Sequence, residues 1–167
     1  MTKITLLVHN IRSTHNVGSI LRTADGFGVE QVICSGYTPY PQLPGDTRLP
    51  HIVEKLTRQI HKTALGAETN PNVSYLPDIH PWLEANKASE QPLPVYALEQ
   101  AVGSKNLRDF QPAKECALLI GEEVHGIAPD LLEWCDDTLE IPMQGKKESF
   151  NVSVATGIAL FALCAPR

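Results

Sequence analysis

Residues 3–36, KITLLVHNIRSTHNVGSILRTADGFGVEQVICSG, decide the fold of this chain. The stretches KITLLVHNI and VEQVICSG are apolar and rich in β-branched residues, so each predicts a strand. Between them, apolar side chains recur at helical spacing at Val17, Ile20, Leu21, Ala24 and Phe27. A strand, a helix and a second strand in this order predict a β–α–β unit, and therefore a parallel sheet with a helical crossover.

Local signals mark the ends of this helix. Ser13, Thr14 and Asn16 are suitable N-cap residues at its start. The sequence GFG at residues 26–28 follows the helix and lacks the third glycine of a dinucleotide-binding loop, so it predicts a helix C-cap and turn. The helix is therefore predicted to begin near Ser13 and to end at residues 26–28.

The rest of the chain continues the alternation of strands and helices. Strands are predicted over NVSYL, LPVYALE, ECALLIG and DTLEIPM, and helices near residues 52–60, in DIHPWLEANKA, in APDLLEWC and over residues 151–163. YTPYPQLPGD reads as a proline-rich loop. With 167 residues, 43% of them hydrophobic, the chain is long enough to bury one core. We expect one domain over residues 1–167.

Composition and charge exclude several classes of protein. No apolar run is long enough to span a membrane, and the first residues do not resemble a signal peptide, so a cytoplasmic location is expected. The formal net charge of −5 argues against a generic nucleic-acid binder. Local basic clusters remain: Arg12 and Arg22; Lys55, Arg58, His61 and Lys62; Lys146 and Lys147. The Lys55–Lys62 group fits a basic patch or a solvated helix face equally well.

Cysteine and histidine spacing gives no support for a metal site. Cys34, Cys116, Cys135 and Cys164 are far apart, in apolar or helix-like contexts, and are expected to be buried free thiols. The six histidines form no H-x-x-x-H pair beside a carboxylate. No metal is therefore expected.

Two polar segments stand where a parallel sheet binds ligands, outside the carboxyl ends of its strands. In LLIGEEVHGIAPDLL, a buried strand ends at Gly121, and Glu123 is either a ligand-site acid or an exposed loop residue. In IPMQGKKESFNVS, Ser149 and Asn151 each suit a helix N-cap as well as a site. Arg22 lies within a largely apolar helix and would need an anion or one of the chain's own acids as a partner.

Together, three segments resemble the three motifs of the SPOUT RNA methyltransferases, and specifically those of the SpoU/TrmH family of RNA ribose 2′-O-methyltransferases. HNVGSILRTAD is similar to the first motif, LLIGEEVHGI to the second and IPMQGKKESFNVSVA to the third. The resemblance implies an α/β fold with a parallel sheet flanked by helices, ending in a deep C-terminal trefoil knot. It also implies a homodimer and the cofactor S-adenosylmethionine. The added RNA-binding domain that some relatives have is not expected in this chain.

The resemblance further implies an enzyme that methylates a ribose 2′-hydroxyl of RNA. Small size and the expected lack of an added RNA-binding domain favour tRNA over rRNA. Base methylation and a non-catalytic RNA-binding role are the alternatives. The residues that match catalytic positions are Asn16, Arg22, Glu123, Ser149 and Asn151, and those that match cofactor-binding positions are Leu98, Gly121, Ile141, Met143 and Phe150. Phe150 stands where the family usually has leucine. Because a guanidinium stays protonated at neutral pH, Arg22 is expected to bind phosphate and stabilise the developing oxyanion.

Overall fold

A parallel seven-stranded sheet organises the computed structural model, which describes residues 2–69 and 72–164. The strands are β1 Lys3–His9, β2 Gln31–Ser35, β3 Val73–Leu76, β4 Val95–Leu98, β5 Lys105–Asn106, β6 Glu115–Ile120 and β7 Asp137–Glu140. The helices are α1 Thr14–Gly26, α2 Pro50–Ala64, α3 His80–Ala88, α4 Pro129–Leu132 and α5 Val152–Cys164, with a 3₁₀ turn η1 at Ala67–Thr69. The parallel α/β sheet flanked by helices is confirmed.

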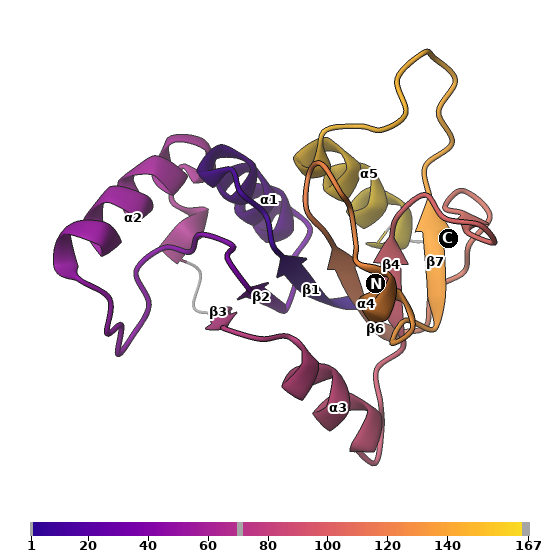
Figure 1. The fold of residues 1–167 in the computed structure, drawn as a ribbon, viewed down its shortest axis with the longest axis horizontal. Helices are drawn as coiled ribbons and strands as arrows, with labels where there is room; N and C mark the ends of the chain where they lie inside the picture. The colour runs from indigo at the N-terminus through magenta and orange to yellow at the C-terminus, as the bar shows by residue number, and fades with distance from the viewer. Residues whose placement is uncertain (1, 70–71, 165–167) are drawn as a thin grey trace.

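Helices cover both faces of the sheet, so the core has two layers (Figure 1). Leu6 and Val8 of β1 and Leu118 of β6 pack with α1, α2 and α5. Leu7 and Leu119, which point the other way, pack with α3 and α4. Side chains of a strand alternate between the two faces, and a strand buried on both faces reads as a continuous apolar run. This is why LLV and ALLI show no alternation in the sequence.

The strand order is β3-β2-β1-β6-β4-β7-β5, and it reverses beside β1. The chain moves outward from β1 through β2 to β3, and later returns to place β6 on the other side of β1. Such a reversal opens a crevice at the carboxyl ends of the two central strands. The segments that follow β1 and β6 therefore meet at this point.

The caps agree with the sequence signals. The Ser13 side chain accepts a hydrogen bond from the Asn16 N–H at the start of α1, and Gly28 has φ of 64° just beyond its end. At α5 the Asn151 carbonyl accepts from the Ala155 N–H and its side chain accepts from the Ser153 N–H, both at 2.9 Å. The capping predictions for Ser13, Asn151 and the GFG turn are confirmed.

Three details differ from the sequence predictions. APDLLEWC forms only a single helical turn, α4, because the chain leaves it for β7 after the C-cap residue Glu133. Strand β5 and turn η1 were not predicted, since segments of 2 and 3 residues carry no periodicity. Cys34, Cys116 and Cys164 are buried free thiols as expected, whereas Cys135 is free but only half-buried.

None of the helices in residues 2–69 and 72–164 is long and apolar enough to cross a membrane.

Candidate active site

The carboxylate of Glu123 joins the loop after β6 to the start of α1. Its Oε2 accepts a hydrogen bond from the Arg12 N–H at 3.0 Å, and its Oε1 accepts from the Ser13 N–H at 3.2 Å. Oε1 also accepts from the Asn16 side-chain amide at 2.9 Å. The remaining amide oxygen of Asn16 accepts from Asn151 Nδ2 at 3.1 Å. The fold thus brings Glu123, Asn16 and Asn151 into one hydrogen-bonded cluster.

The environment of Glu123 keeps its carboxylate charged. Burial raises its pKa, but hydrogen bonds from the Arg12 backbone and the Asn16 side chain outweigh burial, so that the pKa lies below the ordinary value for glutamate. A carboxylate can only accept hydrogen bonds. Glu123 therefore orients the Asn16 amide with its nitrogen inward and its oxygen towards Asn151.

A cavity of about 300 Å³ adjoins this cluster at the carboxyl ends of β4, β6 and β7. It is lined by residues 98–100, 120–126, 139–141, 148–150, 152 and 155. Five of these are acidic: Glu99, Glu122, Glu123, Glu140 and Glu148. In the part of the chain that the structure describes, no lysine or arginine lines it. The cavity therefore suits a ligand that carries positive charge beside an apolar group.

Two glycines shape the β6 loop that forms one wall of the cavity. A Cβ at Gly121 would lie 2.6 Å from Ile127 Cγ1 and 2.7 Å from the Gly126 carbonyl oxygen. Gly126 has φ of 70°, and a Cβ there would lie 2.0 Å from Glu99 Oε2. Backbone hydrogen bonds in both directions between Glu122 and Gly126 close the loop. Gly121 is thus required by the packing of the loop itself, a tertiary reason that the sequence did not indicate.

Glu122, Arg12 and His125 form a second polar group, which the sequence did not assign to the site. Glu122 is 8% exposed, and its Oε1 lies 2.6 Å from Arg12 Nη2. Its Oε2 lies 2.7 Å from His125 Nδ1. Burial raises the pKa of Glu122, but His125 and the charge of Arg12 lower it further, with a net shift downward. In the sequence, the signal for this group was the pair of adjacent acids at residues 122 and 123.

The expected cofactor residues mostly line the cavity. Leu98, Gly121, Ile141 and Phe150 lie in its wall, as does the catalytic candidate Ser149. Met143 lies beyond the end of β7, in the 141–151 loop, and is not part of the lining. Figure 1 shows residues 141–151 as an orange excursion between β7 and α5.

Arg22 lies away from the cluster. It is on the exposed side of α1, and within the described residues it makes no hydrogen bond or ion pair, so the internal salt bridge considered above is not formed. Six residues of α-helix turn the chain by about 600°, which leaves Arg22 roughly 120° from Asn16 around the helix axis. Within one chain, α1 does not direct both side chains at the same ligand.

Comparisons with known proteins agree on one protein family. Residues 46–161 match the family model described as the SpoU rRNA Methylase family. The chain is 31% identical over 152 residues to a tRNA (guanosine(18)-2′-O)-methyltransferase of Aquifex aeolicus, covering 91% of this chain and 64% of that protein. It is 31% identical to the 23S rRNA (guanosine-2′-O-)-methyltransferase RlmB of Coxiella burnetii, covering 93% of this chain and 56% of that protein.

A solved structure shares the fold. The SpoU methyltransferase AviRb of Streptomyces viridochromogenes, in complex with the cofactor AdoMet, superposes with a TM-score of 0.77 at 23% identity, over 97% of this chain and 57% of that one. The chain therefore spans only part of the length of these relatives.

Proposed function

The chain belongs to the SpoU rRNA Methylase family, and from this premise we propose that it transfers a methyl group from S-adenosylmethionine to a ribose 2′-hydroxyl of RNA. One observation supports the proposal: a hydrogen-bonded cluster and an acidic cavity adjoin where the strand order reverses. The cluster consists of Asn16, Glu123 and Asn151. The cavity has a volume of about 300 Å³, and Glu123 also lies in its wall.

The cavity fits the cofactor in size and in chemistry. Its volume of about 300 Å³ lies at the lower end of small-molecule sites, which start at about 300 Å³. Leu98, Ile141 and Phe150 offer apolar contact for an adenine ring, and the glutamates complement the sulfonium and ammonium charges. When bound there, S-adenosylmethionine supplies an electrophilic methyl group.

The cluster would hold the acceptor ribose. A neutral hydroxyl is a weak nucleophile, so its proton must find an acceptor as the new C–O bond forms. Glu123 is fixed by three donors, which suits it to orient Asn16 against the ribose rather than to take the proton. Ser149 lies in the cavity wall, Asn151 is bonded to Asn16, and both would position the sugar. The proton passes to a phosphate oxygen or a water molecule.

Arg22 would act from a second copy of the chain. Its direction around α1 separates it from the cluster of its own chain, and a guanidinium is suited to bind phosphate and stabilise the developing negative charge. The apolar surface of α5 supports a homodimer: the helix has no charged residue, and Val154 and Phe161 are 51% and 66% exposed. Exposed apolar faces of this kind are commonly buried between subunits.

We also propose that the segment from Ile141 into α5 forms the C-terminal knot and that the substrate is tRNA. The 141–151 excursion returns residues 148–150 to the ends of β4 and β6, as a knotted segment would. The tRNA methyltransferase of Aquifex aeolicus supports tRNA, and RlmB of Coxiella burnetii keeps rRNA as the second candidate.

Transfer of a radiolabelled methyl group tests this function. The purified chain is incubated with labelled S-adenosylmethionine and either tRNA or rRNA, and the RNA is digested to nucleosides. Label on the ribose is expected. Label on the base would replace the proposal with base methylation, and failure to bind the cofactor by calorimetry would contradict it.

Arg22→Ala tests the mechanism within the same assay. The variant should lower kcat by about 10²–10³-fold, as for loss of one group that stabilises transition-state charge. Cofactor affinity should be unchanged, since Arg22 does not line the cavity. Equal losses of cofactor affinity and rate would argue against this role.

A further inference from the structure

A second cavity, of about 720 Å³, has Arg12 and Ser13 in its wall. Its walls are the start of α1, the loop that follows β2, and one side of α2, with Tyr37, Tyr40 and Gln59 in the lining. Arg12 and Ser13 also donate their backbone N–H groups to Glu123. The same two residues therefore connect this cavity to the cluster of Asn16, Glu123 and Asn151.

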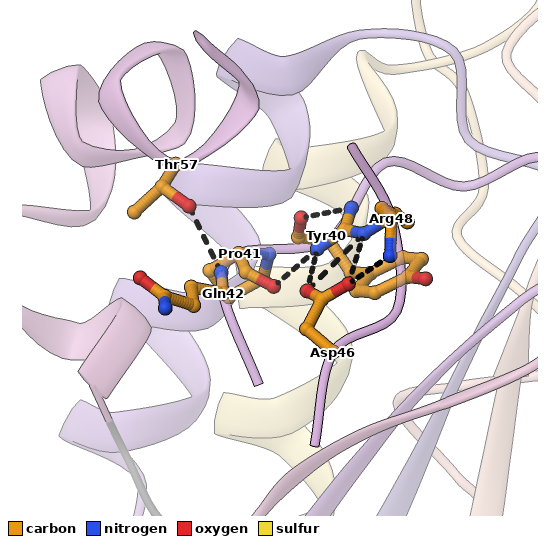
Figure 2. A network of polar contacts seen from close by, with 6 residues as sticks. All are labelled: Tyr40, Pro41, Gln42, Asp46, Arg48 and Thr57. Carbon is orange, nitrogen blue, oxygen red and sulfur yellow. Dashed lines mark hydrogen bonds and ion pairs between the residues drawn. The ribbon is translucent and has the colours of Figure 1, made fainter. Parts of the chain in front are cut away.

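The loop after β2 is held in a fixed shape by Arg48, as Figure 2 shows. Its guanidinium donates to the Tyr40 carbonyl at 3.1 Å and to the Pro41 carbonyl at 3.0 Å, and it pairs with the Asp46 carboxylate. It also lies 3.5 Å from the centre of the Tyr40 ring, whose other side stacks on Tyr75 at 4.0 Å. Arg48 and both faces of Tyr40 are thus occupied within the chain and serve to shape the wall.

Tyr37 is presented by an equally well-defined turn. Asn10 has φ of 56°, and its side chain accepts the Tyr37 N–H at 3.2 Å. Thr38 is buried, and its hydroxyl donates to the Val8 carbonyl and accepts from the Ile11 N–H, both at 3.0 Å. The Tyr37 side chain is nevertheless 55% exposed, and no ring contact to it is formed within the described residues. A rigid backbone therefore holds an aromatic face open to a ligand.

Arg12 places a fixed positive charge beside this ring. Its guanidinium is anchored 2.6 Å from the carboxylate of Glu122, while its side chain remains 58% exposed. Contact with the Tyr37 hydroxyl, followed by the charges of Glu122 and Glu123, raises the pKa of Arg12. The exposed donors of Arg12 can therefore meet an anion in the same cavity as the Tyr37 ring.

The outer edge of the cavity is basic. Gln59 lines it, and Lys55 and Lys62 lie four residues before and three residues after Gln59, so they share its side of α2. Both lysines are exposed. A polyanionic chain leaving the cavity would run along this side of α2.

We propose that the cavity between Arg12 and Tyr37 binds the nucleotide next to the methylated one in the RNA strand. The base stacks on Tyr37, Arg12 contacts the phosphate between the two nucleotides, and Lys55 and Lys62 guide the strand onward. The proposal rests on the proposed function for the identity of the acceptor. An aromatic face beside a basic track is the general arrangement that binds single-stranded RNA.

Tyr37→Ala and Tyr37→Phe test the stacking contact. Binding of fluorescein-labelled tRNA, and separately of labelled rRNA, is measured by fluorescence anisotropy without cofactor. Loss of one stacked base should weaken binding by Tyr37→Ala about tenfold, whereas Tyr37→Phe keeps the ring and should stay within about twofold of the wild type. In turnover assays Tyr37→Ala should raise KM for RNA with kcat and cofactor affinity unchanged.

A charge test uses Lys55→Gln/Lys62→Gln, with Lys114→Gln as the control. Lys114 is exposed just before the amino end of β6, at the opposite end of the strands. The double variant should reduce the slope of log affinity against log salt concentration by about two, and the control should leave it unchanged.

The outcomes separate this site from the proposed function. Equal RNA binding by the wild type and Tyr37→Ala, or no RNA binding by the wild type, overturns the nucleotide site. Lack of cofactor binding or of methyl transfer, with the Tyr37 effect on RNA binding intact, overturns only the proposed function.

Discussion

A single side chain, that of Asn151, both caps a helix and contributes to the site. Its Oδ1 accepts the Ser153 N–H at 2.9 Å, while its Nδ2 donates to Asn16 at 3.1 Å. The amide has one acceptor end and one donor end, so the two roles use different atoms. Capping and site formation are therefore separable by substitution.

Asn151→Asp separates these roles. Aspartate is as good an N-cap as asparagine, so the melting temperature should stay close to that of the wild type. The new oxygen would face Asn16 Oδ1 and add charge near Glu123, and methyl transfer should fall by about 10²-fold. Thermal denaturation and the labelled methyl assay measure the two effects. An Asp variant with full activity would remove Asn151 from the site.

Arg48→Lys tests whether the loop after β2 depends on the guanidinium. Lysine cannot reproduce the paired bonds to Asp46 together with those to two carbonyls. Because the Arg48 and Asp46 side chains are only 18% and 7% exposed, breaking the pair should cost about 3 kcal/mol. Arg58→Lys, on the exposed side of α2, is the control for urea denaturation. Equal stabilities of the two variants would contradict the assigned role.

At the scale of elements, glycine sets the distance between α1 and α2. A Cβ at Gly18 would lie 2.2 Å from Thr63 Oγ1 and 2.3 Å from the Ile60 carbonyl oxygen, so the helices touch through backbone. Their separation fixes the start of α1, which carries Asn16, and therefore bears on the site.

Gly18→Ala should push the two helices apart and lower the free energy of unfolding by about 1–3 kcal/mol, the usual range for overpacking. Gly26→Ala, in the same helix with nothing within 4 Å of the added Cβ, should change stability by less than about 0.5 kcal/mol. Denaturant unfolding of both variants gives the comparison, and a neutral Gly18→Ala would show that the helices can separate at little cost.

His80 links α3 to α4 through charge. Its Nδ1 lies 2.8 Å from Asp78, and its Nε2 lies 3.6 Å from Asp130. The hydrogen bond to Asp78 is the main reason that the pKa of His80 is raised above 6.5. A raised pKa in the folded state stabilises the protein fully below pH 6.5, and the contribution disappears as pH rises through the folded value.

Asp78→Asn keeps the acceptor for the His80 N–H but removes the charge. The wild type should melt above this variant at about pH 5.5, and the difference should shrink by about pH 8.5, where histidine is neutral. Because these side chains are largely exposed, the effect should be small. A difference that stays constant between the two pH values would mean that His80 does not titrate against Asp78.

In the whole molecule, Arg22 and the Asn16–Glu123–Asn151 cluster are not joined within one chain. If the active site is completed by a second copy, each site takes Glu123 from one chain and Arg22 from the other. The uncharged helix α5, with Phe161 66% exposed beside Phe27, offers the surface for such pairing.

Mixing two inactive variants tests this arrangement. Arg22→Ala and Glu123→Gln homodimers should each be inactive. After dissociation and reassociation together, about a quarter of wild-type activity should return, since half of the dimers are mixed and each has one complete site. Arg22→Ala mixed with Arg22→Lys is the control. No recovery in the mixture would show that Arg22 acts within its own chain.

The sequence determined the parallel sheet, because LLV and ALLI must be buried on both faces and the helix between β1 and β2 has clear caps. It also determined which polar residues lie at the strand ends, since Glu123 follows β6 and Asn151 opens α5. Short segments such as β5 escaped prediction, because two residues have no period to detect.

Only the tertiary structure decided which of these residues meet. Hydrogen bonds between Asn16 and residues more than a hundred positions away, Glu123 and Asn151, depend on the strand order that sets β6 beside β1. The same order placed the Arg12–Tyr37 cavity next to the cluster. Local sequence patterns encode the period and the ends of each element, whereas the pairing of distant elements is a property of the whole packed chain.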